Sequence, residues 1–555
     1  MRIAVLAVTP MKAPPRLSGK VLQSIAKASR TRFVSRPLMG AMRVQTGINK
    51  LAGLDSSLRG PFPTSNRAEQ ARPPREYEDA KLPIPSSPSC GDSRSLQTSF
   101  RTGELRPDEW AEACFQRDEK LATKEMASLL HKNPSAQMDA EASTERWQRR
   151  EQLSLLDGVP VLIKEQLAVA GLPHQGGSKN VDGTLSEEDS FAVAALRRAG
   201  AIILGTTVMT EFGMSPLGQN PDRTMPKNPF NPLYLAGGSS TGCGVGVATG
   251  IAPLSIGVDG GGSVRIPAVA NGVFGLKPTW GRVSRSGDLL QGTVNHLGPL
   301  ATSVHDLALG LGVLGGRDSG DIEMHHDWHY GVHEALSSLS RGVRGVRIGV
   351  PEIEWSDCSK ETLGPCEEAL RVLEREGAIL VPIQTTLARL ATEIGSVSLG
   401  VEAQTGLELA VRRAGKRVSS ELEILFNVIR HIPAPEFADA QMLRSGLRLE
   451  MKKIFQNVDL IAYPGLASRL PKATRKEMSE GFSDLGATFR ACRYMFMANL
   501  TGLPAGVAPV GFCSEGLPIG FQLYGDAFDE ASILSGLAHL ERVGFARTQS
   551  PRIVF

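Results

Sequence analysis

Residues 236–285 hold three dense clusters of glycine, and this stretch limits the possible folds more than any other part of the chain. The clusters span Gly237–Gly238, Gly242–Gly250 and Gly260–Gly262. Inside a helix or strand, each glycine costs about 0.5–1 kcal/mol relative to alanine. We therefore expect the clusters to form loops in which backbone N–H groups approach a ligand, rather than regular secondary structure.

Two serines beside these clusters, Ser239 and Ser263, are candidate nucleophiles. The run Gly260–Gly262 directly precedes Ser263 and can direct several N–H groups at one oxygen, as an oxyanion hole requires. A serine nucleophile also needs a base. No histidine lies between His174 and His296, so the base must come from elsewhere in the fold.

Residues 238–242 offer a competing hypothesis, because they match G-x-S-x-G, the nucleophile turn of α/β hydrolases. In that case Ser240 would be the nucleophile of an esterase. Such a turn follows a strand directly, and Pro229 and Pro232 make the preceding segment a poor strand. The five-letter pattern gives this hypothesis weak support.

The composition of the 555 residues is that of a folded globular enzyme, with 41% hydrophobic and 21% charged residues. A net charge of +3 and an aromatic content of 5% give no case for a nucleic-acid partner. No run of about 18 apolar residues predicts a membrane-spanning helix. Seven scattered cysteines favour reduced thiols, so we expect an intracellular, cytoplasmic protein.

Residues 1–100 are expected to be an N-terminal extension outside the catalytic domain, which we place at residues 101–555. Residues 1–54 contain ten Lys or Arg and no acidic residue. This composition is typical of a mitochondrial presequence, although a disordered tail or a wrongly predicted gene start explains it as well. Residues 60–100 are rich in proline, serine and charge, and are expected to be irregular or disordered.

The remainder of the chain alternates between strand and helix patterns, which predicts an α/β fold with a sheet flanked by helices. A strand over 158–165, a helix over 191–200 and a strand over 201–208 form one predicted βαβ unit. Residues 346–383 form a second. Residues 384–455 are expected to be mainly helical, and the chain to close with two strands and a helix over 529–544.

These motifs together resemble the amidase signature family of serine hydrolases. The glycine-rich segment GGSS, the sequence DGGGSVRIPA that follows it and the strand GVPVLIKE carry the resemblance, which extends in matching order over residues 102–545. It implies one catalytic domain built on a large mixed β-sheet. It also implies an enzyme that hydrolyses linear amides to an acid and ammonia or an amine, and that needs no metal or other cofactor.

The family's Ser-Ser-Lys triad carries over residue by residue. The resemblance implies Ser263 as nucleophile, Ser239 as a bridging serine held at a cis peptide, and Lys164 as the final base. It implies an oxyanion hole formed by the N–H groups of Gly260, Gly261, Gly262 and Ser263. Asp259 and Arg265 would support the loop. The family's Thr or Ile before the two loop glycines is Gly260 here, and Thr241 replaces a glycine.

A lysine acts as a base only if its pKa is lowered. An exposed lysine has a pKa of about 10.4 and is protonated at neutral pH. Burial against the apolar strand that carries Lys164 can lower this pKa by roughly 3 units. The hypothesis for Lys164 therefore requires a buried amine.

Other activities and partners remain open on sequence alone. One is an amidotransferase subunit of the same family, which works with a partner enzyme. Residues 384–455 are expected to line the acyl pocket of a small-molecule amide, and a homo-oligomer is possible. His325, His326, His329 and His333 have the spacing of metal ligands on a helix, but the acidic residues around them favour a solvated surface stretch.

Overall fold

The protein is described from a computed structural model, which covers residues 15–63, 65–71, 91–290, 292–324, 330–413 and 417–552. Its centre is a mixed sheet of eleven strands in the order β2-β4-β3-β5-β7-β6-β12-β13-β10-β8-β9. The strands are β2 (Leu129–Lys132), β3 (Pro160–Lys164), β4 (Ile202–Thr207), β5 (Leu254–Asp259), β6 (Phe274–Lys277), β7 (His296–Ala301), β8 (Arg347–Pro351), β9 (Ile379–Ile383), β10 (Leu460–Pro464), β12 (Ala505–Phe512) and β13 (Pro518–Gly525).

Parallel pairs lie near both ends of the sheet. Strand β3 is parallel to β4 and β5, and β8 is parallel to β9 and β10. Both predicted βαβ units are therefore confirmed, with α6 (Phe191–Arg198) and α12 (Lys360–Arg375) as their helices. The other six strand pairs are antiparallel: β2–β4, β5–β7, β7–β6, β6–β12, β12–β13 and β13–β10. The sheet is therefore mixed, as expected.

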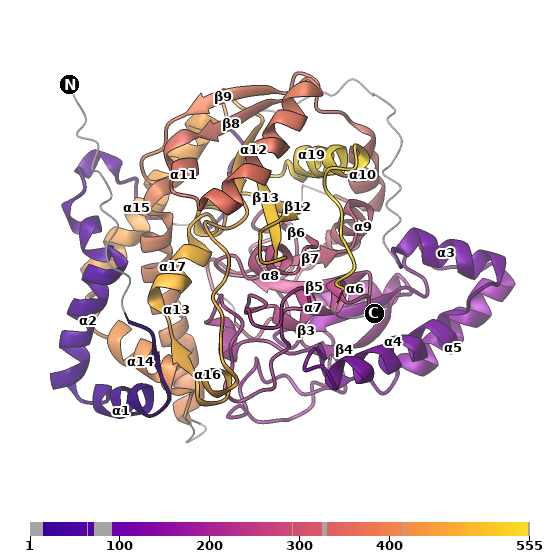
Figure 1. Cartoon of the computed structure of the whole chain (residues 1–555), viewed down its shortest axis with the longest axis horizontal. Coiled ribbons are helices and arrows are strands. Elements are labelled where there is room, and N and C mark those ends of the chain that lie inside the picture. The colour runs from indigo at the N-terminus through magenta and orange to yellow at the C-terminus, as the bar shows by residue number, and fades with distance from the viewer. Residues whose placement is uncertain are drawn as a thin grey trace.

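Helices cover the two faces of the sheet and enclose two large apolar cores (Figure 1). One core includes side chains of α6, α9 (Val304–Leu314), α12 and α19 (Glu530–Arg542). The other includes side chains of α7 (Thr241–Ala248), α8 (Arg265–Ala270), α13 (Ala391–Arg413), α15 (Ala434–Ile454) and α18 (Phe496–Thr501). The two helices of the glycine-rich stretch, α7 and α8, thus pack in this second core.

The glycine cluster at 242–250 is a buried helix, α7, and the expectation that it forms a loop is wrong. Its glycines permit contacts that no larger residue would allow. A Cβ atom on Gly246 would lie 2.4 Å from Leu162 Cδ1, and one on Gly242 would lie 2.7 Å from the carbonyl oxygen of Ser128. Close packing of the helix against the sheet outweighs the low helix propensity of glycine.

The N-terminal region also differs from the expected irregular tail over its described residues. Helices α1 (Gly19–Ser29) and α2 (Arg32–Thr46) lie beside α14 (Ser420–Ile429) (Figure 1). Asn427 donates a hydrogen bond to Ser29 Oγ at 3.0 Å, and Leu22 and Ala26 are buried. Leu22 and Ala26 lie one turn apart on α1, and Met39 is buried on α2, so these basic helices pack through apolar side chains that their composition did not indicate.

The structure also extends the fold before the expected start of the catalytic domain. Helix α3 (Ser93–Thr102) buries Leu96 and Phe100, and the Asp92 side chain caps it by accepting from Ser95 N–H. Helices α4 (Pro107–Ala122) and α5 (Ala136–Arg149) follow. Residues 72–90, the most proline-rich part of the extension, lie outside the described residues.

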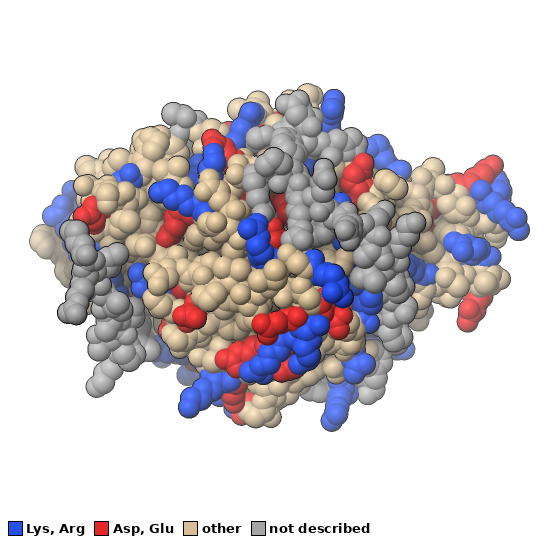
Figure 2. Space-filling model, turned by 90° about the horizontal axis from the view of Figure 1, so that it is seen from above, with Lys and Arg blue, Asp and Glu red and all other residues tan. Residues whose placement is uncertain are grey.

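The short elements complete the chain. They are β1 (Leu17–Ser18), α10 (Val332–Ser337), α11 (Glu352–Ser356), α16 (Arg475–Glu480), β11 (Phe482–Ser483) and α17 (Leu485–Cys492). Within the described ranges, no helix combines the length and apolar character needed to cross a membrane. Positive and negative side chains are interspersed on the face shown in Figure 2.

Candidate active site

Lys164 ends strand β3 in the interior of the molecule. Its side chain is fully buried, and its amine nitrogen donates to Ser239 Oγ at 2.7 Å and to the carbonyl oxygen of Val258 at 3.2 Å. Burial lowers the pKa of Lys164 to about 8. The structure therefore brings Lys164 and Ser239 together as expected, in surroundings that favour a neutral amine.

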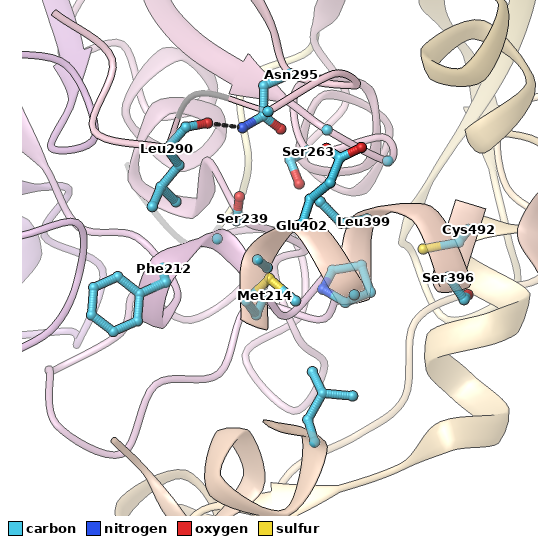
Figure 3. Close-up of a pocket in the computed structure, with 18 of the residues that line it drawn as sticks. Phe212, Met214, Ser239, Ser263, Leu290, Asn295, Ser396, Leu399, Glu402 and Cys492 are labelled. Atoms are coloured by element: carbon cyan, nitrogen blue, oxygen red, sulfur yellow. Dashed lines mark hydrogen bonds between the residues drawn. The ribbon is translucent and has the colours of Figure 1, made fainter. Parts of the chain in front are cut away.

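Ser239 lies in an extended turn before α7, and the Gly238–Ser239 peptide bond is cis. Gly238 fits only without a side chain, because a Cβ atom there would lie 2.7 Å from the carbonyl oxygen of Ser215. The Ser239 hydroxyl faces the same cavity as the Ser263 hydroxyl (Figure 3). No hydrogen bond joins these two hydroxyls in the described part of the chain.

Ser263 lies between β5 and α8, where the chain turns at the three glycines. Its side chain is 9% exposed and lines the cavity. Among the described residues, no acceptor takes the N–H groups of Gly260, Gly261 or Ser263. The N–H of Gly262 instead donates to Asp259 Oδ1 at 2.7 Å. The buried Asp259 carboxylate thus already uses the Gly262 donor, and the role of Gly262 in the oxyanion hole stays a prediction that this bond disfavours.

Asp259 and Arg265 form a fully buried ion pair behind the loop, with Arg265 Nε 3.0 Å from Asp259 Oδ2. Burial alone would raise the pKa of Asp259, but the charge of Arg265 and the bonds from Arg265 and Asn499 hold it below its ordinary value. Arg265 also donates to Asn499 Oδ1 at 2.7 Å. Asp259 also accepts from the N–H groups of Gly262 and Val264, a geometry that suits the loop-supporting role predicted for the pair.

The alternative nucleophile Ser240 lacks the setting of a hydrolase turn. In the described structure no strand directly precedes it, and its hydroxyl is fully buried, donating to the carbonyl oxygen of Val258 at 3.4 Å. It does not line the cavity that contains Ser239 and Ser263. The structure therefore argues against the α/β-hydrolase hypothesis.

A cavity of about 330 Å³ opens from the two serines. Helices α13 and α14 supply much of its wall, as predicted for residues 384–455. Its lining is mainly apolar and includes Phe212, Met214, Leu399, Leu407, Leu425, Ile429 and Phe496. Figure 3 shows Phe212, Met214 and Leu399 around the space below Ser239.

Further contributions to the cavity were not predicted. Met42, Thr46 and Ile48 come from the N-terminal region. Asn295 and Glu402 lie in the wall near Ser263. No local pattern indicated the first group, because its place depends on the docking of α2 against α14. For Asn295 there was a usable signal, because it directly precedes the segment over β7 that is part of the family resemblance. No such signal pointed to Glu402.

The described residues contain no group of three or more His, Cys, Asp or Glu side chains arranged to hold a metal. His325, His326 and His329 of the predicted cluster lie outside the described residues, and His333 lies on α10.

Comparison with known proteins decides the family. The family model described as Amidase matches residues 109–534. The chain belongs to the amidase signature family.

The relatives of this amidase are named for two different activities. It is 31% identical to a glutamyl-tRNA(Gln) amidotransferase component from Chloroflexus aurantiacus, with 83% of this chain and 98% of the relative covered. It is 33% identical to the fatty acid amide hydrolase of Arabidopsis thaliana, over 75% of this chain and 69% of the relative. The Medicago truncatula fatty acid amide hydrolase is 29% identical and is matched over 92% of this chain and 91% of its own length.

Solved structures share the fold. A peptide amidase bound to the inhibitor chymostatin has a TM-score of 0.71 and 26% identity, with 84% of this chain and 99% of that chain covered. A structure described as a vestigial complex related to an s-triazine catabolic enzyme has a TM-score of 0.75 and 26% identity, covering 82% of this chain and 100% of that chain. These matches show an enzyme of a family that acts on carbon–nitrogen bonds.

Proposed function

We propose that this amidase hydrolyses the C–N bond of linear carboxamides through an acyl-enzyme on Ser263. The observation that carries the proposal is the fully buried contact between Lys164 Nζ and Ser239 Oγ, 2.7 Å long, in the cavity that Ser263 also lines. Because the pKa of Lys164 is lowered to about 8, a neutral amine that can accept a proton forms at a far lower pH than for an exposed lysine.

In the first step the Ser263 hydroxyl attacks the amide carbonyl carbon. Its proton passes to Ser239, and the proton of Ser239 passes to the neutral amine of Lys164. The N–H groups of Gly260, Gly261 and Ser263 stabilise the negative charge that develops on the carbonyl oxygen.

Collapse of the tetrahedral intermediate breaks the C–N bond. The leaving nitrogen takes a proton back from Lys164 by way of Ser239, so the base of the first step is the acid of the second. Water then attacks the ester of Ser263 with the same proton relay, releasing the carboxylic acid and restoring the free serine.

The cavity favours an apolar acyl group. Transfer of each CH₂ from water to such a site is favourable by about 0.8 kcal/mol. Leu399, Leu425 and Ile429 offer this environment over α13 and α14. The similarity to plant fatty acid amide hydrolases supports the same substrate class.

An amidotransferase subunit is the second candidate, because the relative in Chloroflexus aurantiacus is 31% identical. Such a subunit passes ammonia to a partner and would take it from a small polar amide. The apolar cavity disfavours this alternative, since a small polar donor would leave much of its wall without contact.

Incubation of the purified full chain alone with a fatty acid primary amide tests the proposal. We expect stoichiometric release of fatty acid and ammonia, and loss of both in Ser263→Ala. Glutamine hydrolysis that appears only with an added partner enzyme, together with no fatty amide turnover, contradicts the proposal and favours the amidotransferase.

A further inference from the structure

Gln166 lies in the wall of the cavity beside the proton relay, and the chemistry proposed above does not use it. It follows Lys164 by two residues, where β3 ends in a turn, and its side chain is only 2% exposed. A buried amide group normally has its hydrogen-bonding atoms paired. The partners of its nitrogen and of its oxygen therefore show what the side chain is still able to bind.

The nitrogen end of the Gln166 side chain is anchored. Its Nε2 donates to Oδ1 of the buried Asp288 at 2.8 Å. The N–H of Leu290 donates to the same oxygen at 3.0 Å, so Oδ1 is an acceptor and the orientation of the Gln166 amide follows from it. The carbonyl oxygen of Gln166 also accepts from Leu289 N–H at 3.1 Å, and Nε2 of His174 lies 2.6 Å from it. Both the backbone and the side chain of Gln166 are thus held in place.

The oxygen end of the side chain remains open to a ligand. Within the described part of the chain, no donor bonds to Gln166 Oε1. Gly213 shows where this oxygen lies, because a Cβ atom at that glycine would be 3.5 Å from Gln166 Oε1 and 3.2 Å from Ser239 Oγ. Gly213 also lines the cavity. The open acceptor and the relay hydroxyl therefore border the same small space at the cavity wall.

The position of Ser239 determines where the leaving nitrogen of the substrate must lie. In the proposed mechanism that nitrogen takes its proton from Ser239, so it has to come within about 3 Å of Ser239 Oγ. This holds whichever wall of the cavity the acyl group lies against. A nitrogen that turns its lone pair toward Ser239 directs its remaining hydrogens elsewhere, and Gln166 Oε1 is an acceptor placed to take one of them.

We propose that Gln166 Oε1 accepts a hydrogen bond from the N–H of the scissile amide and so turns the nitrogen lone pair toward Ser239. This inference rests on the proposed hydrolysis by Ser263. The leaving nitrogen becomes positively charged as the proton arrives from Ser239, so its N–H group becomes a stronger donor. The bond is therefore strongest in the transition state, and it raises kcat more than it lowers KM. An amide without an N–H group does not form it.

Two substrates with the same fatty acyl group test this contact. They are the N-methylamide, which has one N–H group, and the N,N-dimethylamide, which has none. Both need a proton on the leaving nitrogen, so a fault in the Lys164–Ser239 relay slows both of them. The measurement is the ratio of their kcat/KM values in the full chain, because a change that merely loosens the site affects both substrates.

Gln166→Met keeps the length of the side chain but removes its oxygen. We expect it to lower kcat/KM for the N-methylamide about 10- to 100-fold, mainly through kcat, which is the effect of losing one hydrogen bond to a charged group. The value for the N,N-dimethylamide should change little. Labelling of Ser263 by a fluorophosphonate should persist in this variant, since the fluoride leaving group has no N–H.

Gln175→Met is the matched control. Gln175 is a half-buried glutamine of the loop after β3 and is not among the described residues that line the cavity. The same chemical change there should leave the ratio of the two substrates at its wild-type value.

Asp288→Leu is a second variant, which decides the question if Gln166→Met does not fold. Without its anchor the Gln166 amide is free to turn over and present Nε2 in place of Oε1, so the ratio should fall in the same direction. A ratio that stays at the wild-type value in Gln166→Met or, failing that variant, in Asp288→Leu overturns the role of Gln166.

Two further outcomes also contradict the proposal. An equal loss of activity toward both substrates in Gln166→Met assigns the side chain a structural role only, and so does a control variant that changes the ratio as much. In each of these cases the Ser263 chemistry stays intact. If the wild-type protein hydrolyses neither substrate and Ser263 takes no fluorophosphonate label, the proposed function fails and this inference fails with it.

Discussion

The amine of Lys164 and the hydroxyl of Ser239 form a 2.7 Å hydrogen bond in the interior of the protein. They are 75 residues apart in the sequence, on the end of a central strand and on the turn before a buried glycine-rich helix. The bond has no solvent to stabilise a charge on the lysine, because both side chains are buried. In the proposed mechanism this contact is the basis of the proton relay.

Replacement of Lys164 tests whether its amine acts as a base or only supplies a positive charge. Lys164→Ala should lower kcat/KM for a fatty amide by at least about 10³, because the base and the acid for the leaving group are lost together. Lys164→Arg should be nearly as damaging, since a guanidinium stays protonated. Circular dichroism should show both variants folded. An arginine variant with more than about a tenth of wild-type activity would rule out the base role.

The pH dependence of hydrolysis follows from the direction of the Lys164 shift. A lysine with a pKa of about 8 is mainly protonated below that pH and cannot accept the proton from Ser239. We expect kcat/KM to rise through neutral pH with an apparent pKa that belongs to the coupled Ser239–Lys164 pair, and to level off above it. A flat profile between about pH 6 and pH 9 would contradict this assignment.

The Asp259–Arg265 pair should matter for stability more than for chemistry. Arg265→Leu leaves the fully buried Asp259 carboxylate without its cation, so the free energy of unfolding in urea should fall by about 3–5 kcal/mol. Arg149→Leu is the control, because the Arg149–Glu145 pair is exposed and its loss should hardly move the urea midpoint. Equal midpoints for the two variants would show that the buried pair does not support the loop.

The N-terminal helices should set the size limit of the acyl group. Met42 lies in the cavity wall, so Met42→Trp should reduce kcat/KM for long-chain amides several-fold while sparing short ones. Met138→Trp is a suitable control, since Met138 is 65% exposed on α5. An unchanged chain-length profile in Met42→Trp would show that this wall does not contact the substrate.

Much of the fold could be predicted from local patterns. Strand β3, helix α6 and strand β4 have strong periodicity, and Lys164 ends β3 as expected. Tertiary packing overrode local preference in α7, where Gly242 and Gly246 fit against the sheet and Gly244 fits against α8. The N-terminal helices were not predicted, because a basic composition without acidic residues does not distinguish a packed helix from a targeting segment.

The parts of the candidate site that lie within the signature motif could be predicted from the sequence. The places of Lys164, Ser239 and Ser263 follow from the signature motif. The occupied N–H of Gly262 was not predictable, because it depends on how the loop folds back on Asp259. Neither was the joint position of Asn295 and Glu402, which lie 107 residues apart and meet only through the packing of α13 on the loop before β7.

The most direct test of the account is the site of covalent labelling by a fluorophosphonate, mapped by peptide mass spectrometry on the full chain. We predict that the label lies on Ser263 and that Ser263→Ala takes none, while Ser240→Ala, in which the other candidate nucleophile is removed, is still labelled at Ser263. A label on Ser240 in the wild-type protein, or normal labelling of Ser263→Ala, would contradict the assignment of Ser263 as the nucleophile.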